Sequence, residues 1–287
     1  MSKKPLKRTI EELLKMLQRS ARNHKRGFRH YTTMRSLVGM LNSEQMIFSL
    51  LSNSNDGGEY KSDRHYMLCF NYGEAENIAL WALYGIPRNE SVRLTFPCHY
   101  IIDWLASARR GEVEFYAVVN KRITIPLKVP TPKITICDVA YYDNGICTHN
   151  EGIFRVNCDK KTDANPYQNP LLAPYVKKWA WSFEREVRIV LEFDKPVLNA
   201  KGQPYKQIAV DFEEPLHALR DGSGEIRLGP WCRRSAETVR RKGFTKAKIV
   251  SSTFTNQLRL RTPCAECDKT HSKSCRCKHM KCNDGCV

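Results

Sequence analysis

Apolar side chains recur along this chain with two different periods, which predict a mixture of helices and strands. Spacings of three and four residues predict helices at about 9–22, 34–41, 74–84, 98–109, 175–181 and 235–243. Alternating or short continuous apolar runs predict strands at about 46–51, 66–71, 92–96, 113–119, 134–142, 186–193, 208–212, 226–228 and 249–254. Residues 143–173 are rich in turn-forming residues, and we expect a long loop there.

The order of these elements predicts the fold class. Strands and helices follow one another without a regular βαβ repeat, so the pattern favours an α+β fold with a mixed, mainly antiparallel sheet and flanking helices. The segment Thr9-Ile-Glu-Glu12 fits a capping box, and the first helix should begin there. Thr32 or Thr33 should cap the second helix.

Cysteine is concentrated at the end of the chain. Six of the 12 cysteines fall in the tail, and this break in composition places a boundary near Thr262. We therefore divide the chain into a basic N-terminal helix (1–27), a main α+β domain (28–262) and a small Cys-rich tail (263–287). A chain of 287 residues is too long for a secreted disulfide scaffold, which is typically small.

The tail has a spacing typical of zinc ligands. Cys264-x-x-Cys267 is a usual zinc half-site, and metal binding would supply folding energy that so polar a segment cannot obtain from a core. The candidate ligands are the cysteines and histidines of the tail: Cys264, Cys267, His271, Cys275, Cys277, His279, Cys282 and Cys286. The alternative is a reactive or unstructured thiol tail.

Positive charge is clustered in two segments. The formal net charge is +17, from 47 Lys and Arg against 30 Asp and Glu. Residues 1–29 contribute +8 and residues 233–248 contribute +6. Two basic patches favour an acidic partner, so one hypothesis for function is a non-catalytic nucleic-acid-binding protein with a zinc-binding tail.

The sequence also indicates where the protein acts. No stretch approaches the roughly 18 apolar residues of a membrane span. The N-terminus is charged and lacks the apolar core of a signal peptide. We therefore expect a soluble, cytoplasmic protein without a membrane partner.

The segment Glu184-Arg-Glu-Val-Arg188 is the first candidate site. On a strand, Glu184, Glu186 and Arg188 share one face, opposite the apolar residues of the same run. Two carboxylates about 7 Å apart along that face can bind sugar hydroxyls or stabilise a cationic transition state. The alternative is a solvated strand face with an internal ion pair.

Two further segments carry candidate ligand-binding groups. His30 and Thr32 share a strand face, and Trp81 and Tyr84 share a helix face. The alternatives are a structural histidine before a helix cap and an aromatic core face. The chain has no Walker-type phosphate loop, G-x-G-x-x-G, G-x-S-x-G or H-E-x-x-H motif, which excludes several common enzyme classes.

Several segments, in order, resemble the bacterial family known as domain of unknown function 2971. The resemblance covers about residues 28–255 and lies in short motifs: Phe28-Arg-His-Tyr-Thr-Thr33, Phe48-Ser-Leu-Leu-Ser-Asn-Ser-Asn-Asp56, Met67-Leu-Cys-Phe70, Ala79-Leu-Trp-Ala-Leu-Tyr-Gly85, Val139-Ala-Tyr-Tyr142, Trp181-Ser-Phe-Glu-Arg-Glu-Val-Arg-Ile189 and Ile226-Arg-Leu-Gly229. The usual Asn-Asp-Pro of the family is Asn55-Asp-Gly57 here, and the family does not normally carry a Cys-rich tail.

The same segments resemble ADP-ribosyltransferases of the His-Tyr-Glu type. That resemblance implies an ADP-ribosyltransferase-like fold and a cytoplasmic effector that uses NAD in defence or as a toxin. It assigns NAD binding to His30, Thr32 and an aromatic residue, either Trp81 or Tyr84, and the catalytic carboxylate to Glu186 or Glu184. We add His30 as a catalytic candidate and Arg188 as an NAD-binding candidate. A carboxylate would stabilise the oxocarbenium-like sugar formed as nicotinamide leaves. We expect Glu186→Gln to abolish activity while the fold stays intact.

Overall fold

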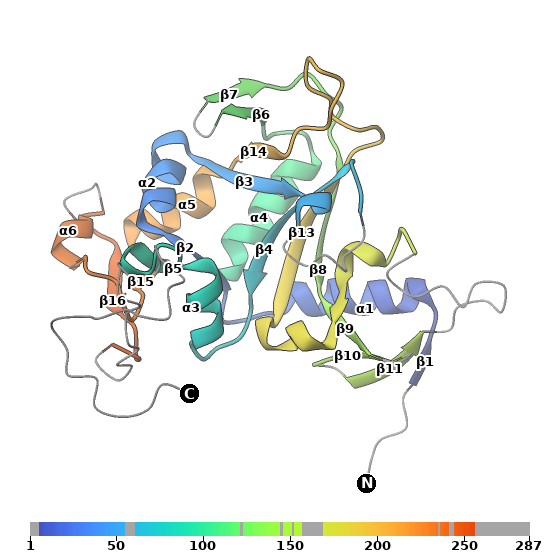
Figure 1. Ribbon diagram of the computed structural model, residues 1–287, viewed down its shortest axis with the longest axis horizontal. Coiled ribbons are helices and arrows are strands. Elements are labelled where there is room, and N and C mark those ends of the chain that lie inside the picture. The colour runs from blue at the N-terminus through green and yellow to red at the C-terminus, as the bar shows by residue number, and fades with distance from the viewer. Residues whose placement is uncertain are drawn as a thin grey trace, which may run out of the picture.

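The structure confirms a mixed α+β fold. The computed structural model describes residues 6–54, 61–120, 123–143, 146–150, 152–156, 169–234, 236–240 and 244–255. Within those ranges the strands form one sheet of 11 strands and one of five, with helices packed around them (Figure 1). The tail predicted at 263–287, with all of its candidate zinc ligands, lies outside the described residues.

The large sheet is mainly antiparallel and branches at one strand. Its main path runs β16 (Lys248–Ser251), β15 (Glu225–Leu228), β5 (Ser91–Phe96), β2 (Phe28–Thr33), β4 (His65–Asn71), β3 (Gln45–Leu50), β14 (Gln207–Asp211), β6 (Phe115–Asn120) and β7 (Ile123–Pro126). The second branch leaves β4 through β13 (Glu186–Glu192) and ends at β8 (Lys133–Asp138). Strand β4 is therefore paired along both of its edges.

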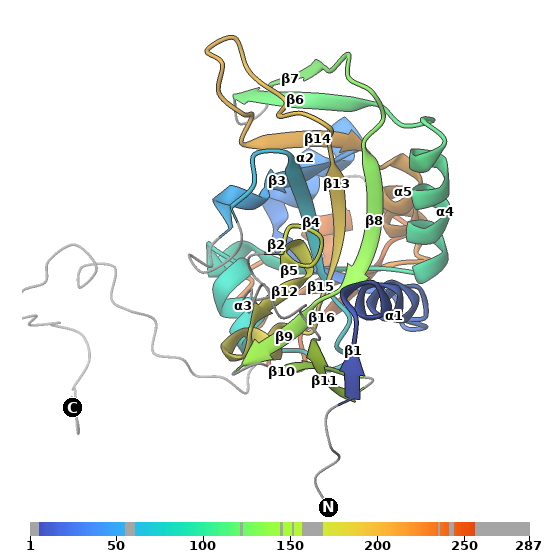
Figure 2. The same cartoon turned by 90° about the vertical axis from the view of Figure 1, so that its right-hand side faces the viewer.

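One face of the large sheet packs against helices to form the main core. These helices are α2 (Met34–Ser43), α4 (Cys98–Arg109) and α5 (Glu213–Asp221). Figure 2 shows α4 and α5 together on one side of the sheet. Val187, Ile189 and Leu191 belong to this core, so the apolar face predicted for β13 is confirmed. The alternating residues of β13 then point to the opposite face.

The small sheet and α1 (Ile10–Arg22) form a second apolar cluster. The sheet runs β1 (Leu6–Arg8), β11 (Gly152–Val156), β10 (Ile146–His149), β9 (Ala140–Asp143) and β12 (Val176–Lys178). Leu13 and Leu17 of α1 pack there with Val190 of β13, so this cluster joins the two sheets. The predicted capping box is present at Thr9, whose hydroxyl accepts a hydrogen bond from the Glu12 amide.

The remaining helices are short. They are α3 (Ile78–Tyr84), α6 (Ala236–Arg240) and the 3-10 helices Leu51–Asn53, Arg88–Glu90, Ala173–Tyr175 and Trp179–Glu184. Thr33 caps α2 as predicted. Residue 235, where the last predicted helix should begin, lies outside the described residues. Asn77 caps α3, so residues 74–77 are not helical as the sequence pattern had indicated.

Three other predictions of local structure are wrong. The loop expected at 143–173 contains β10 and β11, which pair with each other and with β9 and β1. The single strand expected over 134–142 is divided into β8 and β9, which belong to different sheets. The helix expected at 175–181 is the extended strand β12 between two 3-10 turns, because its backbone pairs with β9.

Candidate functional site

A pocket lies where two strands separate along one edge of β4. Strand β13 occupies the whole of the other edge. On the opposite edge, β3 pairs with Tyr66 and Met67, and β2 pairs only with Asn71. Between these contacts Leu68, Cys69 and Phe70 have no partner on this edge among the described strands, and the ring nitrogen Nδ1 of His30 lies 3.0 Å from the Cys69 carbonyl oxygen. The resulting pocket has a volume of about 260 Å³.

The pocket brings together most of the predicted site residues. Its lining includes His30, Tyr84, Glu184, Glu186 and Arg188, which come from β2, α3 and the segment around the start of β13. Side chains more than 150 positions apart in the chain therefore meet at one site. The sequence predicted a shared site only through a family resemblance. In the structure, the separation of β2 and β3 along β4 opens the pocket in which these side chains meet.

The two carboxylates do not share one strand face as predicted. Glu186 is the first residue of β13, but Glu184 ends the preceding 3-10 helix. Arg185 between them adopts a left-handed conformation with φ of 41° and turns the chain. Both carboxylates are almost fully buried, so the solvated face of the alternative is wrong, but its internal ion pair is present between Glu186 and Arg188.

Two buried cations neutralise these carboxylates. The Lys177 ammonium lies 2.5 Å from Glu184 Oε2 and 2.9 Å from Glu186 Oε2. The two carboxylates are therefore closer together than the roughly 7 Å expected for alternate residues on a strand. Arg188 Nε donates to Glu186 Oε1 at 2.8 Å, and its side chain is 0% exposed. Lys177 has no sequence signal, since a buried lysine in a short strand resembles any surface lysine.

The environment moves the pKa values of the two carboxylates in opposite directions. Burial and the neighbouring Glu186 raise the pKa of Glu184 above its usual range. Burial also opposes ionisation of Glu186, but the charges of Arg188 and Lys177 outweigh it and lower the pKa of Glu186. Glu186 is thus held as an anion, whereas Glu184 is the carboxylate that takes up a proton more readily.

Aromatic side chains border the carboxylates. The Tyr84 hydroxyl donates to Glu184 Oε1 at 2.5 Å, and the Lys177 ammonium lies 5.3 Å from the centre of the Trp181 ring. Tyr84 and Trp181 both line the pocket. Flat rings beside a polar group provide a surface on which a heteroaromatic ligand can stack. Trp181 is a pocket residue that sequence reasoning did not assign to ligand binding.

His30 is neutral in this environment. Burial lowers the pKa of His30, although its hydrogen bond to the Cys69 carbonyl opposes the shift. A carbonyl oxygen only accepts, so Nδ1 carries the proton and Nε2 remains an acceptor. Burial also raises the pKa of the Cys69 thiol well above its usual value. Cys69 is therefore protonated, which argues against a thiolate nucleophile here.

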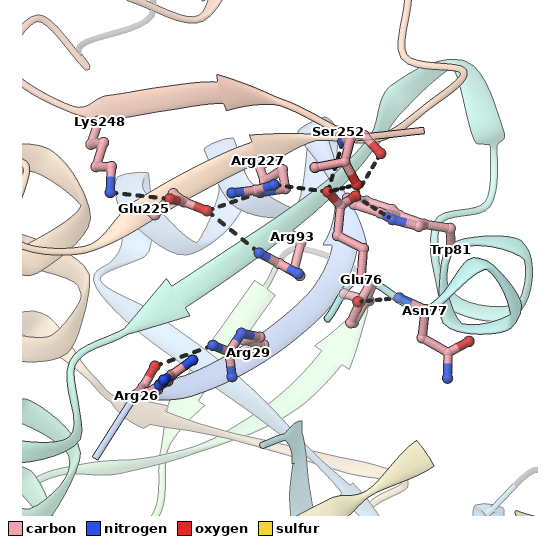
Figure 3. A network of polar contacts seen from close by, with 12 residues as sticks. Arg26, Arg29, Glu76, Asn77, Trp81, Arg93, Glu225, Arg227, Lys248 and Ser252 are labelled. Carbon is pink, nitrogen blue, oxygen red and sulfur yellow. Dashed lines mark hydrogen bonds and ion pairs between the residues drawn. The ribbon is translucent and has the colours of Figure 1, made fainter. Parts of the chain in front are cut away.

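Two predicted binding residues, Thr32 and Trp81, lie outside this pocket. Both are buried, and neither lines the pocket. Trp81 packs edge-on against Tyr31 and donates its indole N–H to Glu76 Oε2 at 3.1 Å (Figure 3). Trp81 is thus a core residue, which leaves Tyr84 as the aromatic side chain of α3 at the site.

Glu76 is another buried carboxylate, which was not predicted from the sequence. It accepts hydrogen bonds from Arg227, Ser252 and Thr253 in addition to the Trp81 indole, and so fixes the end of β16 against α3 (Figure 3). Burial opposes its ionisation, but the hydrogen bonds outweigh burial and lower the pKa of Glu76 to about 2. Both carboxylate oxygens of Glu76 accept hydrogen bonds from these protein groups, which indicates a structural role.

The described part of the chain contains neither a metal-ligand cluster nor a membrane-spanning helix. There, no group of three or more His, Cys, Asp or Glu side chains is arranged to hold a metal ion. Nor, among the same residues, is any helix long and apolar enough to cross a membrane. The zinc hypothesis concerns the tail alone and stays a prediction.

Comparisons with known proteins add no family assignment. No protein-family model matches this sequence, and no curated protein and no solved structure matches it either. The resemblances to domain of unknown function 2971 and to ADP-ribosyltransferases therefore rest on sequence motifs alone and stay predictions.

Proposed function

We propose that this chain is an ADP-ribosyltransferase-like enzyme that cleaves NAD at the bond between nicotinamide and ribose. The observation that carries the proposal is the pair of buried carboxylates, Glu184 and Glu186, whose pKa values shift in opposite directions at one pocket. Environments that separate the pKa values of two neighbouring acids are typical of sites where the two play different catalytic roles. The neutral His30 and the rings of Tyr84 and Trp181 complete the pocket.

The size of the pocket limits what it binds. Ligand sites typically measure about 300–1,000 Å³, and this one measures about 260 Å³. It suits the nicotinamide and ribose end of NAD, with the rest of the dinucleotide outside it. In this arrangement the nicotinamide ring stacks on an aromatic side chain, and His30 Nε2 accepts a hydrogen bond from a sugar hydroxyl.

The two carboxylates divide the chemistry between them. As the glycosidic bond breaks, nicotinamide leaves with the bonding electron pair and the ribose carbon becomes positively charged. Glu186, held as an anion, stabilises that charge. Glu184, with its raised pKa, accepts the proton of the attacking acceptor group as the new bond to the ribose carbon forms. Lys177 contacts both carboxylates and fixes their positions.

Nicotinamide release from labelled NAD tests this proposal. The full chain is incubated with NAD alone, with cell lysate and with nucleic acid, and released nicotinamide and transferred label are measured. Glu184→Gln should slow release by about 100- to 10,000-fold, the usual contribution of a positioned acid or base. Glu192→Gln is the matched control, because Glu192 lies at the other end of β13, outside the pocket. No release under any of these conditions would refute the proposal.

A further inference from the structure

A larger and strongly basic hollow lies beside the pocket that contains Glu184 and Glu186. It has a volume of about 850 Å³ and shares only Arg29 with that pocket. Seven lysine and arginine side chains line it against three carboxylates: Arg22, Lys25, Arg26, Arg29, Arg93, Arg227 and Lys248 against Glu74, Asp103 and Glu225. We call this hollow the basic basin.

Strand register explains why these cations gather on one face. Thr95 of β5 pairs with Arg29 of β2 and with Glu225 of β15, and Glu225 pairs in turn with Lys248 of β16. Residues paired across a ladder point to the same face of a sheet. The adjacent residues Phe28, Leu94 and Ile226 point into the core on the other face. The polar positions of four strands therefore form the floor of the basic basin.

The basin floor contains buried guanidinium groups with unused donors. Arg93 is 3% exposed and Arg29 is 7% exposed. Within the described part of the chain, Nε and Nη1 of Arg93 and Nε of Arg29 have no hydrogen-bond partner. A buried N–H group without an acceptor is costly, and more so on a cation. Such donors are expected where an anion completes the site.

The acidic groups nearby do not satisfy these donors. Glu225 lies 3.4 Å from Arg93 Nη2, but it is also bound by Arg227 at 3.0 Å and by Lys248 at 3.2 Å (Figure 3). Arg29 and Arg93 lie near one another on β2 and β5, and burial together with the charge of Arg93 lowers the pKa of Arg29. The two like charges repel each other in the unliganded protein.

We infer that the basic basin binds phosphate groups, of a nucleotide or of a nucleic-acid strand, through the free N–H groups of Arg29 and Arg93. Guanidinium groups present paired donors that match phosphate oxygens. The volume falls within the range of small-ligand sites, and the exposed cations at its margin suit a ligand with several negative charges. Both basic segments predicted from the sequence reach this basin, 1–29 through Arg22 to Arg29 and 233–248 through Lys248.

Binding of inorganic pyrophosphate to the full chain at low salt tests the inference. Calorimetry should detect binding, and Arg93→Gln should weaken it at least tenfold. Arg35→Gln is the matched control, since it removes the same charge from an exposed position on α2 outside the basin. Absence of binding by the wild type, or equal binding by Arg93→Gln, would overturn the inference.

Thermal unfolding of the same variants separates a binding role from a structural one. Because Arg93 lies next to another buried cation, Arg93→Gln should unfold at the wild-type temperature or above it when no ligand is present. A markedly lower unfolding temperature would instead show that Arg93 stabilises the fold through Glu225. Lys248→Gln provides a second variant that keeps the buried groups intact, as the Lys248 side chain is 60% exposed. It should weaken pyrophosphate binding two- to threefold.

Two further ligands identify the source of the phosphate. ATP and a 5′-phosphorylated oligonucleotide are compared at several salt concentrations, and both should lose affinity in Arg93→Gln. Tighter binding of the oligonucleotide, with a steep fall as salt rises, would assign the basin to nucleic acid. Tighter binding of ATP would assign it to a nucleotide. Neither measurement depends on NAD cleavage, so phosphate binding by the basic basin is tested independently of the proposed enzyme activity.

Discussion

Removing the charge of Glu186 should destabilise the fold, contrary to the sequence-based expectation that Glu186→Gln leaves it intact. Arg188 is 0% exposed and directs Nε and Nη2 at this carboxylate, at 2.8 and 3.3 Å. Glutamine keeps the shape but leaves the guanidinium without its counter-charge. Breaking one side of a buried ion pair typically costs about 3–5 kcal/mol. That is a large part of the 5–15 kcal/mol by which domains are usually stable.

A double-mutant cycle measures this coupling. Urea unfolding followed by tryptophan fluorescence gives the free energy of unfolding for the wild type, Glu186→Gln, Arg188→Met and the double variant. The double variant removes both charges, so it should be more stable than the sum of the single losses predicts, by about 2–3 kcal/mol. Lys177 keeps its contact with Glu184 throughout.

Two outcomes would refute this reasoning. A loss below about 1 kcal/mol for Glu186→Gln would be the size expected of an exposed pair, and it would mean that water reaches the Arg188 guanidinium. Additive losses in the double variant would mean that the two side chains stabilise the protein independently. Either result would also remove the reason for the lowered pKa of Glu186.

Three further predictions concern other parts of the chain. Thr9→Ala removes the hydroxyl that caps α1 and should lower the free energy of unfolding by about 1 kcal/mol, measured by urea titration. Glu76 has a lowered pKa, so the stability it contributes is complete above the ordinary glutamate pKa of about 4.3. That contribution, up to about 3 kcal/mol, is lost as the pH falls towards 2, and unfolding curves of Glu76→Gln should not show this loss. Elemental analysis should find zinc in the full chain and none after removal of residues 263–287; its absence from both would end the zinc hypothesis.

Local signals predicted the starts of α1, α2 and α4 and many of the strands, but they missed α5. The caps at Thr9 and Thr33 involve residues three positions apart, so their pattern is visible in the sequence. The errors arose where distant pairing decides the structure, as in β12, which is extended because β9 lies beside it. The break between β8 and β9 follows Asp138, which is buried and lies 2.7 Å from His24 and 2.8 Å from His149. Neither histidine is a sequence neighbour of that break.

The candidate site was only partly predictable for the same reason. The alternation around Glu186 and Arg188 is a local signal, and it correctly separated the polar face of β13 from the apolar one. The 3-10 helix Trp179–Glu184 and the left-handed residue Arg185 turn the chain so that both carboxylates lie beside Lys177. Neither feature has a periodic pattern in the sequence, so this contact was not predictable. The proximity of Arg29 and Arg93 depends on the pairing of β2 with β5, although the alternation of Arg93 and Thr95 with apolar residues in β5 was visible in the sequence.

A crystal structure of the protein soaked with NAD would show whether the pocket holds the nicotinamide and ribose end of the dinucleotide. Density for the nicotinamide ring should lie against Tyr84 or Trp181, with a ribose hydroxyl within about 3 Å of the Glu184 or Glu186 carboxylate, a normal hydrogen-bond length. Density for NAD elsewhere on the protein, with the pocket between β2 and β3 empty of ligand, would contradict this placement.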